Sequence, residues 1–158
     1  MRRFWQGLTL LLMLAVYSVA QAQAPAYGNE VTLDTAKKVT AAAEAEAKKN
    51  NWPVVIAIVD PHGLLVMLQR IDNTQTGSVT VAIEKARTAA MFKRPSKALE
   101  DVIAGGRVTY LGLPGETPIE GGLPLMQGGK IIGAIGVSGM TSPQDGQVAK
   151  AGADSVGK

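Results

Sequence analysis

The segment from Gly128 to Gly139 constrains the fold of this chain more than any other part of the sequence. It begins with a glycine pair suited to a tight turn and continues as an apolar, strand-forming run from Lys130 to Ser138. Glycine inside a strand costs backbone entropy and loses a packing side chain, so Gly133 and Gly136 predict a close approach to the strand backbone. A helix, a neighbouring subunit or a flat ligand would each meet this requirement.

The first 22 residues have the three-part pattern of a secretory signal peptide. Arg2 and Arg3 precede an apolar run from Leu8 to Val16, and the small residues around Ala22 supply a cleavage site. A membrane anchor is the competing interpretation, but the run is shorter than the roughly 20 residues that a spanning helix needs. We therefore expect residues 1–22 to be removed on export to the periplasm or the medium, with no membrane association afterwards.

The rest of the chain predicts one domain. Residues 23–30 are small, polar and proline-containing and predict a flexible lead-in, while residues 31–158 suffice for one domain and are short for two. Removing residues 1–22 takes away two arginines and no acidic residue, which lowers the formal charge from +3 to +1. The remaining basic residues form no run, so we expect no nucleic-acid partner. The lack of cysteine excludes disulfides, thiolate metal sites and a cysteine nucleophile.

The first half of the domain predicts a helix and then a hairpin. Thr32 can cap a helix from about Leu33 to Asn50, whose narrow apolar stripe is mostly alanine and predicts close packing against a sheet. Residues 53–59 are almost continuously apolar, as a central strand covered on both faces would be. Residues 60–63 fit a type I turn, and residues 64–70 return as the second strand of an antiparallel hairpin.

The second half of the domain alternates helices, glycine-rich turns and short strands. The predicted elements are helices at 78–92 and 96–103, strands at 107–110, 117–120, 123–127 and 130–138, and a last helix from Ser142. The loop at 111–116 holds too many turn residues for regular structure and would make a binding rim. Two hairpin groups separated by helices predict an α+β fold, with helices on the faces of an antiparallel sheet.

Several separate motifs, in this order along the chain, resemble the GlcG/HbpS family of haem-binding and haem-degrading domains over about residues 31–156. These motifs are Trp52–Asp60 with Gly63, Gln69–Asp72, Lys85–Ala89, Gly121–Pro124 and Gly133–Gly139. The resemblance implies a profilin-like fold with a five-stranded antiparallel sheet in three α/β/α layers. It also implies a homo-oligomer, and binding of haem or iron by exported members that act as redox-linked sensors or carriers. A related module ends a corrinoid adenosyltransferase.

His62 is the first candidate metal ligand. It is the only histidine in the chain, so a histidine-ligated haem, a zinc site or a histidine-based triad would have to use it. The type I turn explains the same residue without any ligand, as an exposed side chain at the tip of a hairpin. A haem-ligating histidine elsewhere in relatives cannot be carried over to this position.

Tyrosine, threonine and methionine side chains are the other candidates for an axial ligand to haem iron. The candidates are Tyr110, Thr117, Met67, Met91, Met126 and Met140. Methionines more commonly fill gaps in a core. Tyr110 and Thr117 flank the loop that contains Pro114 and Gly115, and we predict these four residues to form a ligand rim. Tyr110 is equally explained as a cover for the edge of the core, with its hydroxyl in water.

Basic side chains near this rim are candidates for holding the carboxylates of haem or another flat small molecule. They are Arg70, Lys85, Arg87 and Arg94. Lys85 has apolar neighbours on its helix, so we expect it to face the pocket. The predicted ligand site also includes Arg70, Gly133 and Gly136. Arg70 is equally explained as half of a surface ion pair with Asp72, worth roughly 0–1 kcal/mol. The spacing of the strand glycines does not match the dinucleotide-binding pattern.

These patterns lead to three hypotheses of function. The first is an exported haem-binding protein that carries, senses or otherwise handles haem. The second is an enzyme or binding protein for a small carboxylate or a corrinoid-type cofactor, although no Ser/His/Asp arrangement or cluster of metal ligands names a reaction. The third is an oligomeric assembly module in which the glycine-containing strand packs subunits together.

Overall fold

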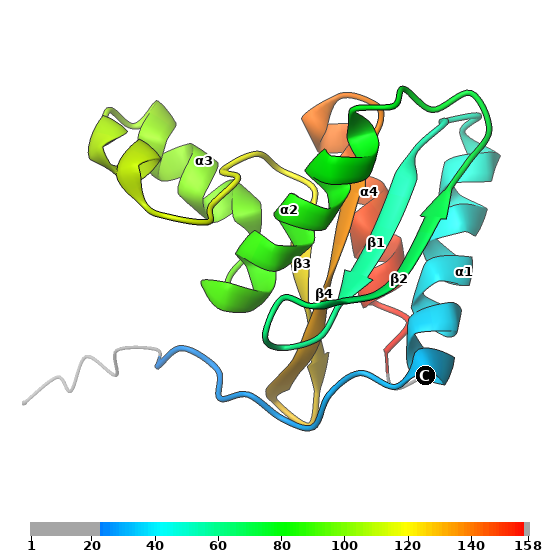
Figure 1. Cartoon of the computed structure of the whole chain (residues 1–158), viewed down its shortest axis with the longest axis horizontal. Helices are drawn as coiled ribbons and strands as arrows, with labels where there is room; N and C mark the ends of the chain where they lie inside the picture. Colours follow the sequence, from blue (N-terminus) through cyan, green and yellow to red (C-terminus); the bar gives the residue numbers. More distant parts are fainter. Residues whose placement is uncertain (1–22, 157–158) are drawn as a thin grey trace, which may run out of the picture.

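The structure, a computed structural model, describes residues 23–156 as helices around one antiparallel sheet (Figure 1). The predicted signal peptide, residues 1–22, lies outside the described residues. The elements are α1 Leu33–Lys49, β1 Val55–Val59, β2 Leu65–Arg70, α2 Ser78–Met91, α3 Ser96–Ala104, the 3-10 helix η1 Val108–Gly112, β3 Gly122–Gln127, β4 Lys130–Ser138 and α4 Ser142–Ala153.

The four strands lie in the order β2-β1-β4-β3, and every neighbouring pair is antiparallel. β1 and β2 form the predicted hairpin. The Asp60 carboxylate fixes its turn by accepting hydrogen bonds from the amides of His62 and Leu64, at 2.8 and 2.9 Å. β4 lies between β1 and β3, so the pairing of β1 with β4 joins two hairpins that are far apart in the sequence.

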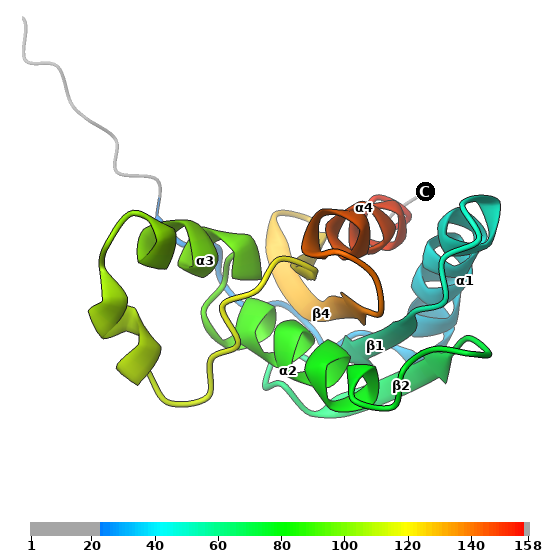
Figure 2. The same ribbon diagram turned by 90° about the horizontal axis from the view of Figure 1, so that it is seen from above.

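Helices cover both faces of the sheet, as Figure 2 shows. α1 and α4 pack together on one face, and α2 crosses the other face over β1 and β4. The alanine stripe of α1 is buried at Ala36, Ala43 and Ala47, as predicted. The α+β prediction is confirmed, whereas the profilin-like class stays a prediction. None of the helices in residues 23–156 is long and apolar enough to span a membrane.

The predicted five-stranded sheet is wrong, because two predicted strands are not strands in the described chain. Residues 107–110 lie mostly in η1, and residues 117–120 are irregular. The amides of Thr117 and Glu120 donate instead to side chains of α2 and α3, each at 2.7 Å. Pro118 has no amide hydrogen, so this segment has few donors left for a strand ladder.

Part of the predicted flexible lead-in is held against the sheet. Ile131 of β4 donates its amide to the carbonyl of Ala26 at 2.9 Å and accepts the amide of Gly28 at 2.8 Å. A parallel bridge between Tyr27 and Ile131 accompanies these bonds. The contacts extend the pairing of β4 beyond the end of β1, so this stretch of the lead-in is hydrogen-bonded to the sheet.

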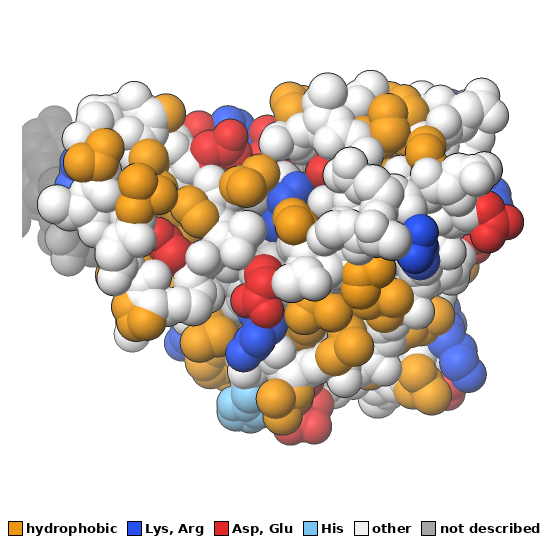
Figure 3. Space-filling model, turned by 45° about the horizontal axis from the view of Figure 1, so that its top comes forward, with side chains coloured by type: hydrophobic (Ala, Val, Ile, Leu, Met, Phe, Trp, Pro, Cys, Tyr) orange, Lys and Arg blue, Asp and Glu red, His pale blue; other side chains and the backbone are white. Residues whose placement is uncertain are grey.

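Residues 96–121, which comprise α3, η1 and the following loop, project from the body of the domain, and we call them the arm (Figure 1). Ser96 ties the arm to the sheet: its hydroxyl accepts the Gly122 amide at 2.9 Å and donates to the Ile119 carbonyl at 2.6 Å. Hydrophobic side chains gather on the arm (Figure 3), and Val108 and Leu111 are about 60% exposed. The arm therefore carries apolar surface that the described residues do not cover.

Candidate functional site

Lys85, which we predicted to face inward, is buried in an ion pair. Its ammonium donates to Asp145 Oδ2 at 2.9 Å and to the Val137 carbonyl at 3.1 Å. Asp145 lies in the first turn of α4 and also accepts the Met140 amide at 3.0 Å. Burial raises the pKa of the Asp145 carboxyl, and the hydrogen bond and charge of Lys85 oppose that rise. Lys85 is thus bonded within the protein and not free to hold a ligand carboxylate, which corrects its predicted role.

The strand glycines are buried as well. A side chain at Gly136 would collide with the carbonyl of Ala82 and the amide of Ala86, because α2 lies directly on the strand there. A side chain at Gly133 would collide with the Val59 carbonyl of β1. The predicted close approach is confirmed, but it comes from the chain's own helix and strand. The chain's own residues therefore occupy the space beside both glycines in which a ligand surface was predicted.

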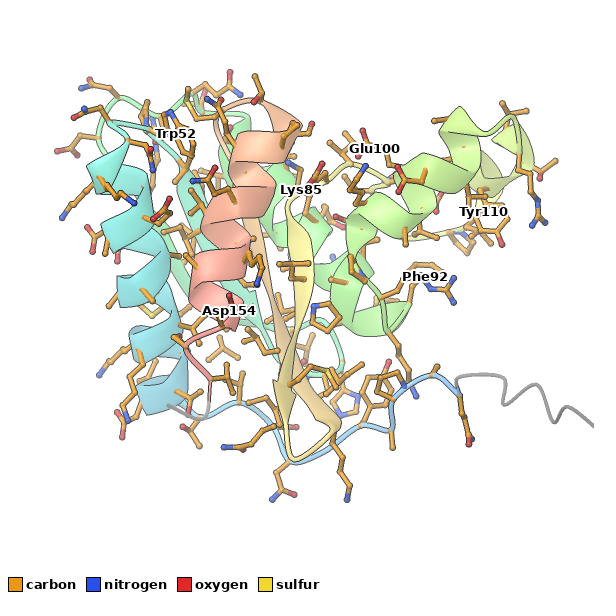
Figure 4. All side chains as sticks on the ribbon, turned by 180° about the vertical axis from the view of Figure 1, so that it is seen from behind. Trp52, Lys85, Phe92, Glu100, Tyr110 and Asp154 are labelled. Atoms are coloured by element: carbon orange, nitrogen blue, oxygen red, sulfur yellow. The ribbon has the colours of Figure 1, made fainter. Side chains whose placement is uncertain are left out.

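The four predicted rim residues lie together on the arm. Tyr110 is in η1, where the Arg107 guanidinium lies 4.8 Å from the centre of its ring. Pro114 and Gly115 are exposed in the next loop, and Thr117 is half-buried against α2. Figure 4 shows Tyr110 on the arm and Lys85 inside the body, so the structure does not bring the rim and the predicted basic anchor into one site.

Arg70 and His62 lie elsewhere on the surface. Arg70 ends β2, the edge strand farthest from β3, and its guanidinium donates to the Thr74 carbonyl at 2.7 Å. His62 is exposed at the tip of the β1–β2 hairpin, with Nε2 4.0 Å from Glu30. Residues 23–156 contain no group of three or more His, Cys, Asp or Glu side chains arranged to hold a metal ion. The predicted site residues therefore do not converge.

An apolar groove of about 460 Å³ runs along β3, and we call it the β3 groove. It is lined by Pro25, Lys93, Arg94, Pro95, Leu123, Pro124, Met126, Lys150, Ala153 and Asp154. Figure 4 shows β3 between the end of α4, marked by Asp154, and the end of α2, marked by Phe92. β3 is an edge strand. The groove thus follows the free edge of the sheet, between the end of α4 on one side and the end of α2 on the other.

Alternation along β3 gives the groove two walls. Leu123 and Leu125 face the core shared with α1 and α4, and Leu125 is fully buried. Side chains of successive strand residues point to opposite faces, so Pro124 faces the side that carries α2. The register with β4 shifts between Leu125 and Met126, and Met126 lines the groove together with Pro124. One wall is therefore Pro124 and Met126 with the corner between α2 and α3, and the other is Leu123 with the end of α4.

The β3 groove has an excess of positive charge. Lys150 pairs with Asp154 at 2.6 Å, whereas Lys93 and Arg94 form no ion pair within the described part of the chain. The Lys93 ammonium lies 4.1 Å from the centre of the Tyr27 ring, a cation–π contact that leaves its charge uncompensated. Arg94 donates its Nε–H to the Phe92 carbonyl at 3.0 Å, which occupies one of its donors but supplies no negative charge. Lys93 and Arg94 are therefore basic side chains without a carboxylate partner among the described residues.

Comparison with known proteins identifies the family. The model of the family described as "Haem degrading protein HbpS-like" matches residues 31–154. The chain belongs to the HbpS-like family. Protein GlcG of Escherichia coli strain K12 is 45% identical to it over 103 residues, which cover 65% of this chain and 77% of GlcG. The resemblance drawn from the sequence motifs is thus confirmed.

Solved structures of relatives share the fold of this HbpS-like protein. The crystal structure of HbpS matches with a TM-score of 0.77 and 32% identity, over 83% of this chain and 93% of HbpS. A crystal structure of a complex of PduOC with haem matches with a TM-score of 0.73 and 27% identity, over 81% of this chain and 96% of PduOC.

The sequence of this HbpS-like protein contained two signals for features that our prediction missed. Pro124 lies within a predicted strand, and proline in a sheet is confined to edges, so Pro124 marked β3 as an edge strand. Lys85 faced inward on its helix, and a buried ammonium needs a buried partner. No local pattern, however, pointed to Asp145 as that partner or to Lys93 and Lys150 as neighbours across one groove.

Proposed function

We propose that this HbpS-like protein is an exported haem-binding protein and that haem binds in the β3 groove. The observation that carries the proposal is the combination of apolar walls and basic side chains in one groove. Its volume of about 460 Å³ falls in the range of small-molecule sites, roughly 300–1,000 Å³. The haem complex of PduOC, a relative with the same fold, supports the same class of ligand.

The walls fit a flat, largely apolar macrocycle. Leu123, Pro124, Met126 and Ala153 line the groove with hydrocarbon and a thioether. Burying such surface against a porphyrin would stabilise the complex by about 25 cal/mol for each Å² removed from water. The edge of β3 is a poorer template for an added protein strand, because Pro124 has no amide hydrogen to donate.

The basic side chains fit the two carboxylates that haem carries. Lys93 and Arg94 are adjacent in the corner that links α2 to α3, and Lys150 lies on α4 across the groove. Charge-assisted hydrogen bonds to carboxylates contribute about 1.5–3 kcal/mol each. Arg94 can form a two-pronged bond with one carboxylate, which would also orient the ligand.

Export is part of the same proposal and rests on the sequence. Arg2 and Arg3, the apolar run and Ala22 support a signal peptide that is cleaved after residue 22. Cleavage after Ala22 would make Gln23 the new N terminus, two residues before Pro25, which lines the β3 groove. Cell fractionation and the intact mass of the recovered protein test this part. A protein that stays in the cytoplasm with its leader attached would contradict it.

Haem titration of the protein recovered after expression of the full chain tests the binding function. We expect a saturable shift of the Soret band, and a drop in affinity of about tenfold or more in the double variant Lys93→Glu/Arg94→Glu, since tenfold corresponds to 1.4 kcal/mol. The double variant Lys37→Glu/Lys38→Glu changes the charge equally on an exposed face of α1 and is the matched control. An unchanged Soret band would contradict haem binding, and equal affinities of the two double variants would contradict the β3 groove.

The same samples separate haem binding from the two other hypotheses. Thermal-shift measurements with corrinoids and small carboxylates test for another ligand, and stabilisation by one of them without any effect of haem would favour the second hypothesis. Light scattering tests the predicted homo-oligomer, for which the exposed apolar residues of the arm supply a surface. With haem bound, loss of the Soret band on adding reductant and oxygen would favour degradation over carriage or sensing.

A further inference from the structure

We infer that the thioether of Met126 is the protein ligand to haem iron in the β3 groove. The inference rests on the proposed haem-binding function. Among the candidate ligand side chains in residues 23–156, Met126 is the one that lines this groove. Methionine sulfur is a known axial ligand of haem iron. The remaining candidates all lie outside this groove.

The other methionines belong to the core or to another surface. Met67 accepts a hydrogen bond from the Thr40 hydroxyl at 3.6 Å and packs against the main core, as does Met140. Met91 is exposed at the end of α2, where it packs beside the turn at Gly63. None of the three lines the β3 groove.

The oxygen and nitrogen candidates are also elsewhere. Tyr110 is held on the arm beside Arg107, and Thr117 faces α2 from the loop that follows η1. His62 is at the tip of the β1–β2 hairpin, with its side chain 68% exposed. An iron atom in the β3 groove would therefore meet the sulfur of Met126 before any of these groups.

Met126 has the exposure and the direction that a ligand needs. It is 37% exposed and lines the groove, whereas its neighbour Leu125 is fully buried in the core. Pro124 lines the groove together with Met126 and supplies apolar wall. Lys93 and Arg94 line the same groove, so the groups that would hold the carboxylates and the sulfur that would hold the iron share one site.

The chemistry of a thioether gives this assignment distinct consequences. Sulfur in methionine is neutral and soft, so it favours ferrous over ferric haem and raises the reduction potential relative to an anionic tyrosine ligand. Bound haem also shields the sulfur from oxidants, which otherwise convert an exposed methionine to its sulfoxide. Both consequences are measurable without any assay of activity.

Spectroscopy of three variants tests the ligand. In Met126→Leu we expect haem to stay bound through the walls and basic groups, but the resonance Raman and magnetic circular dichroism signals of an iron–thioether bond to disappear. In Met126→His we expect imidazole-type spectra and a lower reduction potential. Met91→Leu removes an exposed methionine outside the groove and should retain the wild-type spectra. Thermal unfolding of all variants shows that each is folded.

Oxidation by chloramine-T, followed by peptide mass spectrometry, provides an independent test. Met126 and Met91 are 37% and 45% exposed, so both should oxidise readily without haem. Saturating haem should slow the oxidation of Met126 about tenfold or more and leave that of Met91 unchanged, a contrast in rate that corresponds to about 1.4 kcal/mol of activation free energy. Met91 thus serves as a control within the same molecule.

The outcomes separate this inference from the function on which it rests. If wild-type protein binds haem but Met126→Leu keeps the same ligation spectra, or haem leaves the oxidation of Met126 unchanged, the ligand assignment is overturned and haem binding stands. If wild-type protein shows no Soret shift at all, both the function and the assignment are overturned. Loss of the thioether signals in Met126→Leu but not in Met91→Leu, with haem protecting Met126 but not Met91 from oxidation, supports the assignment.

Discussion

The Lys85 ammonium and the Asp145 carboxylate, 60 residues apart in the sequence, meet at 2.9 Å with both side chains 2% exposed. The pair joins the middle of α2 to the first turn of α4, and the Val137 carbonyl of β4 accepts a second hydrogen bond from the same ammonium. Three elements are thus tied at one buried point. Removing either charge would leave the other buried without its partner.

Lys85→Met should destabilise the protein strongly. Breaking a buried pair from one side costs about 3–5 kcal/mol of the free energy of unfolding, because the remaining charge stays buried. The double variant Lys85→Met/Asp145→Leu removes both charges and should recover most of this loss, since apolar replacement of a buried pair is often neutral. Urea denaturation measures both. A loss below about 1 kcal/mol in the single variant would show that the pair has little energetic weight.

The effect of Lys85→Met should also depend on pH. Burial raises the folded-state pKa of Asp145 above its ordinary value of 3.8. Between these two pKa values the folded state binds more protons than the unfolded state, so stability rises as pH falls. Without Lys85 the pKa rises further, because its hydrogen bond and charge no longer favour the carboxylate. The gap between wild type and Lys85→Met should therefore be largest at neutral pH and shrink toward acid. A gap that is constant with pH would contradict this origin.

Gly136→Ala should destabilise the protein by about 1–3 kcal/mol or more, because the new methyl group would collide with the backbone of α2 and overpack the interface. Gly77→Ala is the matched control, since no atom lies within 4 Å of the added methyl and the backbone there, with φ −60°, suits alanine. Its effect should stay within about 1 kcal/mol. Thermal or urea unfolding compares the two. Equal effects would show that α2 can move off the strand at little cost.

Ser96→Ala should loosen the arm. The substitution leaves the Gly122 amide without its acceptor and the Ile119 carbonyl without its donor, at a cost of about 1–3 kcal/mol. Hydrogen exchange should become faster in residues 113–121. Thr80→Ala, at an exposed helical position, is the control and should leave both measurements unchanged. Unaltered exchange in the Ser96 variant would mean that other contacts hold the arm.

Haem affinity should fall as salt concentration rises, because the proposed anchors are exposed charges that mobile ions screen. The double variant Lys93→Glu/Arg94→Glu should lose most of this salt dependence along with its affinity. Titrations between low and high salt, with Lys37→Glu/Lys38→Glu alongside, measure the difference. A salt dependence that is the same in both double variants would place the carboxylates outside the β3 groove.

Local patterns in the sequence predicted most helices and strands, because periodicity, capping and turn chemistry depend on residues close together in the chain. The hairpin of β1 and β2 follows from the turn at 60–63, and the burial of Lys85 follows from its apolar neighbours. The strand predicted at 117–120 does not form, for a physical reason. Its amides are taken by side chains of α2 and α3, which lie far away in sequence.

By itself the sequence determined the family, the helices, the hairpins and the need for something to approach Gly136 closely. Only the tertiary structure decided that α2 fills that need, that Asp145 receives Lys85, and that β1 pairs with β4. It alone gathered residues of the lead-in, the corner of α2 and α3, the strand β3 and the end of α4 into one groove. The reason is that a short segment fixes its own conformation, whereas the choice of partner depends on how all the segments bury their apolar faces together.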